Sequence, residues 1–352
     1  MIKGCSEKVD IRRMTWDMAK KDTNYQGIAN QTGNDTRKVI GIGETLLDII
    51  FRNNQPEKAV PGGSTFNCMV SLGRCNIPAL FISELGNDRI GCLLRDFMQE
   101  NNLSTKYIDF FDEGSTPVSL AFMDESQQAE YQFFRKFPKQ RLRITFPEIN
   151  ADDILILSSY FAVNPELHEK IYALIQYAKQ QKAIIYYDLN FRKAHISERK
   201  LLMPFVLENI ANASLVRCSD EDLENLFPGQ AIESIYHKYI EPERKSLIVT
   251  HGKGFIQLRT PFFHKNYSVE AIKPVSTIGA GDSFNAGIIY GLMRNGFLSD
   301  DLCCLHEVLW DDLIATGQIF AKKVCLSSEN FVPRDFARQN RFIKKDLEKY
   351  NL

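Results

Sequence analysis

Residues 276–287 read STIGAGDSFNAG, three small residues followed by an acid at the start of an apolar segment. The pattern predicts a helix N-terminus, where unpaired N–H groups and a partial positive charge suit an anion. Gly279, Ala280 and Gly281 would let a phosphate approach those N–H groups closely. Asp282 would stand where a carboxylate can take the proton from an attacking hydroxyl. Alone, such an acid is more often a helix-stabilising residue; the whole string favours a phosphoryl-transfer site.

A second motif lies near the start of the chain, where residues 61–67 read PGGSTFN and SLG follows four residues later. Gly62 and Gly63 let the backbone approach a ligand, and Ser64 is expected to cap a helix that begins there. Asn67 lies one turn inside that helix and can point its amide toward the same ligand. A glycine pair before a helix is weak by itself, so this motif gains its weight from its order relative to the first.

The chain has 352 residues, with 43 Lys plus Arg and 44 Asp plus Glu, so it carries no basic field suited to nucleic acid. No apolar run approaches the roughly 18 residues of a membrane span, and the first residues lack the apolar core of a signal peptide. The eight cysteines, at positions 5, 68, 75, 92, 218, 303, 304 and 325, form no C-x-x-C pair. We therefore expect a cytoplasmic protein with reduced thiols and neither a nucleic-acid nor a membrane partner.

From residue 39 onward, short apolar runs alternate with helical patterns, as in an α/β fold with a parallel sheet covered by helices. The expected strands are 39–42, 79–83, 154–157, 184–188, 215–217 and 247–250. The expected helices are 64–72, 89–100, 165–180, 201–212, 281–295 and 307–324. Residues 116–124 and 129–135 alternate around the polar turn ESQQ, which predicts a β-hairpin. Residues 1–38 are polar and aperiodic and are expected to be a flexible extension with a short helix around 12–21.

Together the two motifs resemble the signatures of the ribokinase-like (PfkB) family of carbohydrate kinases, in which the GAGD segment forms the anion hole and carries the catalytic base. The resemblance covers residues 39 to 333 and implies a kinase domain at 39–340, followed by a tail at 341–352. The implied fold is a central, mostly parallel sheet flanked by helices, with a small β-sheet lid from segments near 49–60 and 116–136. It also implies ATP and Mg²⁺, and a homodimer is consistent with family members whose lid edges pair.

The resemblance assigns several residues to the sugar. Gly62, Gly63 and Asn67 would line the sugar site. Asp48, which follows the first strand, would accept hydrogen bonds from sugar hydroxyls, although an ordinary turn acid would look the same. Arg135, at the end of the hairpin, would reach down to the substrate, with a solvated edge-strand cation as the alternative.

Two strings are assigned to the phosphates and the nucleotide. DLNFR, which ends at Arg192, resembles the D-x-N-x-R string of fructokinase-like and ketodeoxygluconate-kinase-like members. There Asn190 would bond a phosphate oxygen, and Arg192 would offset negative charge at the substrate. THGKG, which begins at Thr250, resembles the family's turn at the nucleotide, where Thr250 and Gly252 would contact phosphate or ribose.

Two positions depart from the family pattern. Where the family often has N-x-x-E to organise Mg²⁺ through water, this chain has Ser219 beside the nucleotide and Asp222 as the acid. Asp222 keeps the charge on a shorter arm, and fructokinase-like members tolerate Ser at the first position. Ser276 replaces an acid that helps to hold a monovalent cation in related kinases, which makes a requirement for such a cation doubtful. Neither change removes the base or the anion hole.

Other phosphate-binding schemes are disfavoured, because the chain has no G-x-x-x-x-G-K-[ST] string and no complete dinucleotide fingerprint. Since the hairpin most resembles those of fructokinases, we expect ATP-dependent phosphorylation of a primary sugar hydroxyl, with fructose favoured. The alternatives are a 2-keto-3-deoxygluconate kinase and a kinase of another ketose or a nucleoside. A catalytically weak, sugar-binding regulatory protein is the alternative of a different class, and the changes at Ser219 and Ser276 motivate it.

Overall fold

The computed structural model describes residues 37–123 and 129–336. Residues 37–334 make up one compact unit, and every element described below belongs to it. Apart from residues 37 and 38, the extension expected at 1–38, with its helix around 12–21, lies outside the described residues. So does the tail expected at 341–352.

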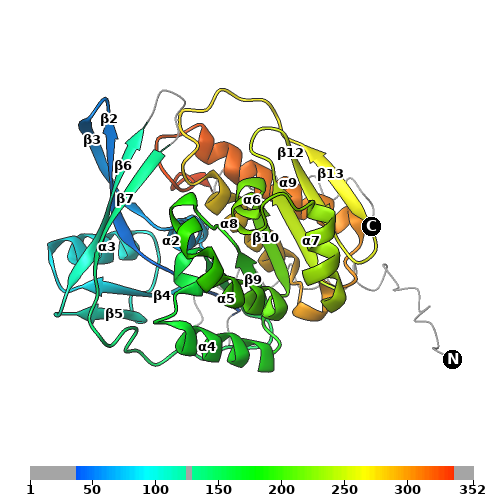
Figure 1. Ribbon diagram of the computed structural model, residues 1–352, viewed down its shortest axis with the longest axis horizontal. Coiled ribbons are helices and arrows are strands. Elements are labelled where there is room, and N and C mark those ends of the chain that lie inside the picture. The colour runs from blue at the N-terminus through cyan, green and yellow to red at the C-terminus, as the bar shows by residue number, and fades with distance from the viewer. Residues whose placement is uncertain (1–36, 124–128, 337–352) are drawn as a thin grey trace. The chain divides into compact units, whose positions relative to one another are not determined.

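The unit is built on a nine-stranded sheet with the order β13-β12-β11-β10-β9-β8-β1-β4-β5 (Figure 1). Strands from β11 to β5 in this order are parallel, and β12 and β13 extend the sheet as antiparallel strands. All six predicted strands are present, because their unbroken apolar runs suit parallel strands that are buried on both faces. The strands are β1 (Val39–Ile42), β4 (Ala79–Gly86), β5 (Ile108–Phe111), β8 (Ile154–Ser158), β9 (Ile184–Asp188), β10 (Leu215–Ser219), β11 (Ser246–Thr250), β12 (Phe255–Arg259) and β13 (His264–Ser268).

Helices cover both faces of this sheet. One continuous apolar core joins the sheet to α4, α5, α6 and α7, while α2, α8 and α9 belong to a second layer in which α8 packs on both α2 and α9. Figure 1 shows α4, α5 and α7 on the near side of the sheet and α9 on the far side. The α-helices of the described chain are α2 (Ser64–Arg74), α3 (Arg89–Glu100), α4 (His168–Gln180), α5 (Arg199–Asn212), α6 (Asp220–Leu226), α7 (Ile232–Tyr239), α8 (Ala280–Asn295) and α9 (Glu307–Cys325).

The helix predicted at 165–180 starts later than expected, at His168. Asn164 Oδ1 accepts a hydrogen bond from the N–H of Glu166 at 2.9 Å, and the Asn164 carbonyl accepts one from the N–H of Leu167 at 3.0 Å. Asn side chains offer the backbone such local partners in competition with the helix. Residues 165–167 therefore form a turn, and α4 begins after it.

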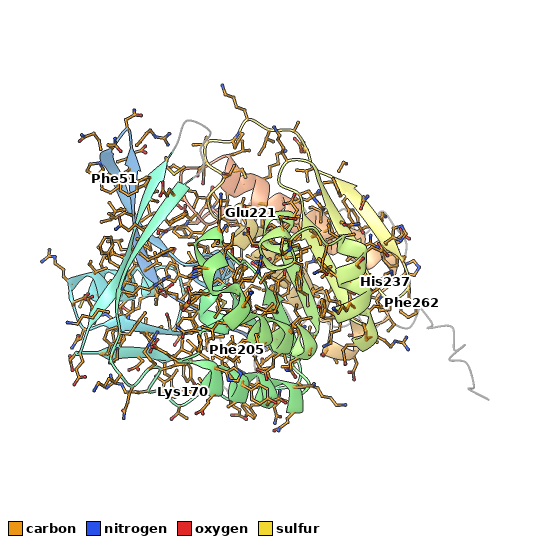
Figure 2. The ribbon with its side chains drawn as sticks, in the orientation of Figure 1. Phe51, Lys170, Phe205, Glu221, His237 and Phe262 are labelled. Atoms are coloured by element: carbon orange, nitrogen blue, oxygen red, sulfur yellow. The ribbon has the colours of Figure 1, made fainter. Side chains whose placement is uncertain are left out.

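A second sheet has four strands in the order β3-β2-β6-β7 (Figure 1). Its outer pairs are antiparallel, whereas β2 and β6 run parallel. Asn53 and Asn54, with φ values of 51° and 57°, form the tight turn between β2 and β3. Figure 2 shows Phe51 near the outer end of this small sheet, where its ring stacks on that of Phe122 with 4.9 Å between centroids. The strands are β2 (Leu46–Arg52), β3 (Gln55–Gly62), β6 (Ser115–Met123) and β7 (Ala129–Lys136).

The predicted hairpin is confirmed as β6 and β7, although its connection at 124–128 lies outside the described residues. In the described part of the chain, no helix is long and apolar enough to cross a membrane. The seven cysteines described there are free thiols, of which Cys68, Cys75 and Cys218 are buried.

Candidate active site

The carboxyl ends of the parallel strands meet at one edge of the nine-stranded sheet, and α2 and α8 begin at the same edge. The hydroxyl of Ser64, the first residue of α2, links the last residue of β8 to the first turn of α8. Glu221, which Figure 2 labels in the first turn of α6, follows directly after β10. Open α/β sheets tend to bind ligands at this edge. The last residues of β8, β9, β10 and β11 are Ser158, Asp188, Ser219 and Thr250.

Asp282 lies in the first turn of α8, as predicted, and is buried with 7% of its surface exposed. Its Oδ1 accepts a hydrogen bond from Ser64 Oγ at 2.7 Å, and its Oδ2 accepts one from Asn67 Nδ2 at 2.9 Å. Burial raises the pKa of Asp282, and these two hydrogen bonds oppose the rise, as do the charges of Arg192 and Arg217. The carboxylate is thus fixed in position and made more basic than an exposed one.

The prediction that Ser64 caps α2 is wrong. The N-cap is Gly63, without a side-chain capping bond, and the Ser64 hydroxyl turns instead to Asp282. The same hydroxyl receives a hydrogen bond from Ser158 Oγ at 3.2 Å, and Ser158 Oγ lies 2.8 Å from Thr65 Oγ1. A chain of three hydroxyls therefore runs from Thr65 on α2, through Ser158 on β8, to Ser64 and the carboxylate. A contact across 218 residues leaves no local signal in the sequence.

The chain enters α8 through a left-handed conformation at Gly279. Gly279 is the N-cap with φ 78°, and its α-carbon packs against Asn330, so a Cβ there would overlap the Asn330 carbonyl oxygen and lie 2.9 Å from the carbonyl carbon. The N–H of Ala280 already donates to the Thr277 carbonyl, over a long 3.3 Å. Gly281 lies over the Arg217 guanidinium.

Asp48 is on β2 of the small sheet, and its carboxylate lies close to Ser119 on β6 and Gly62 on β3. Ser119 Oγ, on β6, donates a short hydrogen bond to Asp48 Oδ1. A Cβ on Gly62 would overlap Asp48 Oδ2 and lie 2.9 Å from Asp48 Cγ, so only glycine fits there with the carboxylate in place. Burial raises the pKa of Asp48 to about 6, helped by the charges of Glu44 and Asp282 and opposed by the Ser119 hydrogen bond.

Arg135, at the end of β7, points back toward the large sheet and pairs with Glu44, two residues after β1. Both guanidinium hydrogen bonds reach the Glu44 carboxylate, from Nε at 2.5 Å and from Nη2 at 2.6 Å. The guanidinium also lies 4.1 Å from the centroid of the Phe133 ring. Arg135 is therefore not a solvated edge-strand cation, because Glu44 already balances its charge.

A buried polar network that the sequence did not reveal lies beneath the start of α8. Arg217 Nη1 is 3.1 Å from Asp188 Oδ1, and Arg217 Nη2 donates to Thr250 Oγ1 at 2.7 Å. Asn285 Nδ2 donates to Asp188 Oδ2 at 2.7 Å, and Tyr186 OH donates to Asn285 Oδ1 at 2.9 Å. Burial raises the pKa of Asp188 to about 6, although the Arg217 charge opposes the rise. The residues sit on three different strands and a helix, so only the fold brings them together.

The remaining predicted residues lie along the same edge. Asn190 is buried with φ 37°, whereas the surface of Arg192 is exposed. The surrounding protein displaces part of the water around Arg192 and so opposes its charge, but the nearby carboxylates of Asp222 and Asp282 outweigh this effect and raise its pKa. Gly252 has φ 52° and open space around it, as a turn that receives a ligand would need.

The sequence of this chain is similar to those of known carbohydrate kinases. The model of the pfkB family carbohydrate kinase matches residues 37–303, more than half of the chain. The chain belongs to the pfkB family of carbohydrate kinases. Its curated relatives include fructokinase-2 of Solanum lycopersicum, which is 25% identical over 77% of this chain and 86% of the relative. Probable fructokinase-2 of Arabidopsis thaliana is 22% identical over 80% of this chain and 89% of the relative.

Solved structures agree on the fold of this sugar kinase. The fructokinase of Vibrio cholerae O395, solved with fructose, ADP and calcium ion bound, aligns with a TM-score of 0.73 and 21% identity over 85% of this chain and 96% of that one. Aminoimidazole riboside kinase of Salmonella enterica aligns with a TM-score of 0.70 and 18% identity over 87% of this chain and 99% of that one. At these identities the solved structures establish the fold alone.

The acidic side chains of the kinase suit a metal that arrives with the nucleotide. No group of three or more His, Cys, Asp or Glu side chains within residues 37–123 and 129–336 could hold a metal ion. Asp222 Oδ2 accepts the Ser219 N–H at 2.7 Å, and Ser219 Oγ accepts the Asp222 N–H at 3.1 Å, so the pair caps α6. Mg²⁺ is usually held by one or two carboxylates, waters and substrate phosphates. Asp222 fits such a role through water better than an all-protein site.

Proposed function

We propose that this kinase transfers the γ-phosphoryl group of ATP to the primary hydroxyl of a small neutral sugar, with fructose as the substrate. The observation that carries the proposal is the pair of hydrogen bonds from Ser64 and Asn67 to Asp282. These bonds join the two motifs that resemble the family's signatures and hold one basic carboxylate at a helix N-terminus. A base and an anion site then lie side by side, as phosphoryl transfer needs.

In the proposed reaction Asp282 takes the proton of the sugar hydroxyl while the hydroxyl oxygen attacks the γ-phosphorus. The new P–O bond forms as the bond to the β-phosphate oxygen breaks, and ADP leaves with its electron pair. Asn67 Oδ1 is buried and has no hydrogen-bond partner among the described residues, so it can accept a hydrogen bond from the same sugar. The N–H groups in the first turn of α8, including that of Gly281, would bind the transferring phosphoryl group.

The nucleotide would lie over the ends of β9 to β11, where Asn190, Ser219, Thr250 and Gly252 are found. Mg²⁺ bound to the triphosphate would neutralise phosphate charge, with Asp222 as its water-mediated protein partner. The small sheet would act as a lid that excludes water from the transfer. Among the described residues no further strand pairs with its outer strands β3 and β7, so a homodimer through them is part of the proposal.

Charge at the sugar site favours a neutral substrate. Asp48 would repel a sugar carboxylate, and Arg135 cannot balance that charge without giving up Glu44. Arg192 alone would be left to offset it. These contacts support fructose over 2-keto-3-deoxygluconate, and the fructokinase names of the relatives point the same way.

Sugar binding should weaken in acid. Since the pKa of Asp48 is about 6, lowering the pH from 7 to 5 should protonate most of it and raise the KM for fructose roughly tenfold. Steady-state kinetics across this range measure the effect. Asp188 has a similar pKa, so Asp48→Asn separates the two: this variant should have a higher KM that no longer changes with pH. A wild-type KM that stays flat from pH 7 to 5 would exclude Asp48 as an ionised sugar ligand.

A coupled ADP-release assay with MgATP tests the substrate. Fructose, tagatose, ribose, adenosine and 2-keto-3-deoxygluconate are compared by kcat/KM, and fructose is expected to be highest. Highest turnover with the acid sugar or with adenosine would replace fructose but keep the kinase. Sugar binding by calorimetry without turnover on any of them would favour the regulatory binding protein instead.

A further inference from the structure

Arg217 places a guanidinium directly behind the first turn of α8. It lies on β10 with 6% of its surface exposed, and no sequence motif marks it. A Cβ added to Gly281 would lie 3.1 and 3.2 Å from the two terminal nitrogens of Arg217 and 3.5 Å from Cζ. The guanidinium therefore lies next to the side of Gly281 where another residue would carry its Cβ.

Two features of this position work against a buried cation. A cation at a helix N-terminus meets the positive end of the helix dipole, and burial of the charge removes its hydration. Burial opposes the charge, but the Asp188 carboxylate outweighs this effect and raises the pKa of Arg217, and Thr250 accepts a further hydrogen bond. Arg217 Nε still lacks a hydrogen-bond partner within the described residues. An anion bound on the other side of Gly281 would face both the helix N-terminus and the guanidinium, and both would attract it.

We propose that Arg217 is a positioning residue whose fixed positive charge, acting through the first turn of α8, strengthens the site for the transferring phosphoryl group. The proposal rests on the proposed function, because it takes that group to bind at Gly281. Arg217 touches neither the base nor the sugar. Its charge reaches Asp282 as well, where it helps to keep the carboxylate ionised. Thr250 and Asp188 hold the guanidinium from two sides, so its plane is fixed against Gly281 before any phosphate arrives.

Three variants separate the charge of Arg217 from its packing. Arg217→Lys keeps the charge, Arg217→Gln removes it but can still donate to Asp188, and the double variant Asp188→Asn with Arg217→Gln removes both buried charges. We expect Arg217→Gln and the double variant to lower kcat roughly 10²-fold, as the loss of a charge-stabilising donor does. The KM for fructose should change less than about threefold, because nothing near the sugar moves. Arg217→Lys should keep kcat within about tenfold of the wild type.

Binding of a non-hydrolysable ATP analogue, measured by calorimetry, gives a second readout. Its affinity should fall about tenfold in Arg217→Gln and in the double variant but not in Arg217→Lys. Near wild-type turnover in the double variant would overturn the proposal, because Arg217 would then serve only to neutralise Asp188. Equal losses in the Lys and Gln variants would overturn it as well. If the wild type phosphorylates none of the sugars, the proposed function is wrong. A tenfold loss of analogue affinity in Arg217→Gln and the double variant, but not in Arg217→Lys, would still support the role of the cation.

Discussion

Replacing Asp282 with Asn is expected to lower kcat by at least roughly 10²–10⁴-fold, the contribution of a positioned general base. Asn has nearly the same shape but cannot accept the proton of the sugar hydroxyl. Ser64 and Asn67 remain to hold the residue, so fructose binding measured by calorimetry should change little. The coupled ADP-release assay measures the loss of turnover.

Asp300→Asn is the matched control for this variant. Asp300 is an exposed aspartate in the short turn that follows the other end of α8, and its replacement should leave kcat and KM unchanged. Near-normal turnover in Asp282→Asn would remove Asp282 from the reaction. Lost fructose binding in a folded Asp282→Asn variant would show instead that the residue acts as a sugar ligand.

Gly279→Ala is expected to have the second largest effect. An alanine with φ near 78° costs about 1–2 kcal/mol of stability on its own. Its Cβ would also overlap the Asn330 carbonyl oxygen, so the start of α8 must shift. Because a displacement of about 1 Å at a reacting group can cost 10²-fold, we expect kcat to fall by about that factor. Thermal unfolding and ADP release report the two consequences separately.

Gly229→Ala provides a control with the same backbone conformation but open space. Gly229 has φ 71°, lies between α6 and α7, and has no atom within 4 Å of an added Cβ. Its replacement should lower stability by about 1–2 kcal/mol and leave kcat unchanged. If both variants lose stability equally and both keep full turnover, the contact between Gly279 and Asn330 plays no part in shaping the anion site.

Local patterns in the sequence were sufficient for the central strands and most helices. The short apolar runs of β1, β8, β9 and β11, which alternate with helical patterns along the chain, are typical of strands buried on both faces. β12 and β13 were missed because they form an exposed antiparallel edge: His264–Ser268 is mostly polar, and its side chains are exposed at every second position. β5 has only four residues and α7 only eight, so both elements are too short for a periodic signal.

The active site was predictable where a motif is contiguous and not where it depends on packing. Asp282 and its three small neighbours form one string, so their place at the start of α8 could be expected. The partners of Asp282 come from α2, and the cation behind Gly281 comes from β10. The ion pair of Arg135 with Glu44 was not foreseen either, because Glu44 lies 91 residues away along the chain.

The most direct test of the account is to identify the product. The wild-type chain is incubated with MgATP and fructose, and the reaction is followed by phosphorus NMR. We expect one fructose phosphate, esterified at a primary hydroxyl, for each ADP formed, and neither product with Asp282→Asn. Release of ADP and inorganic phosphate without a sugar phosphate, or fructose binding without any ADP, would contradict it.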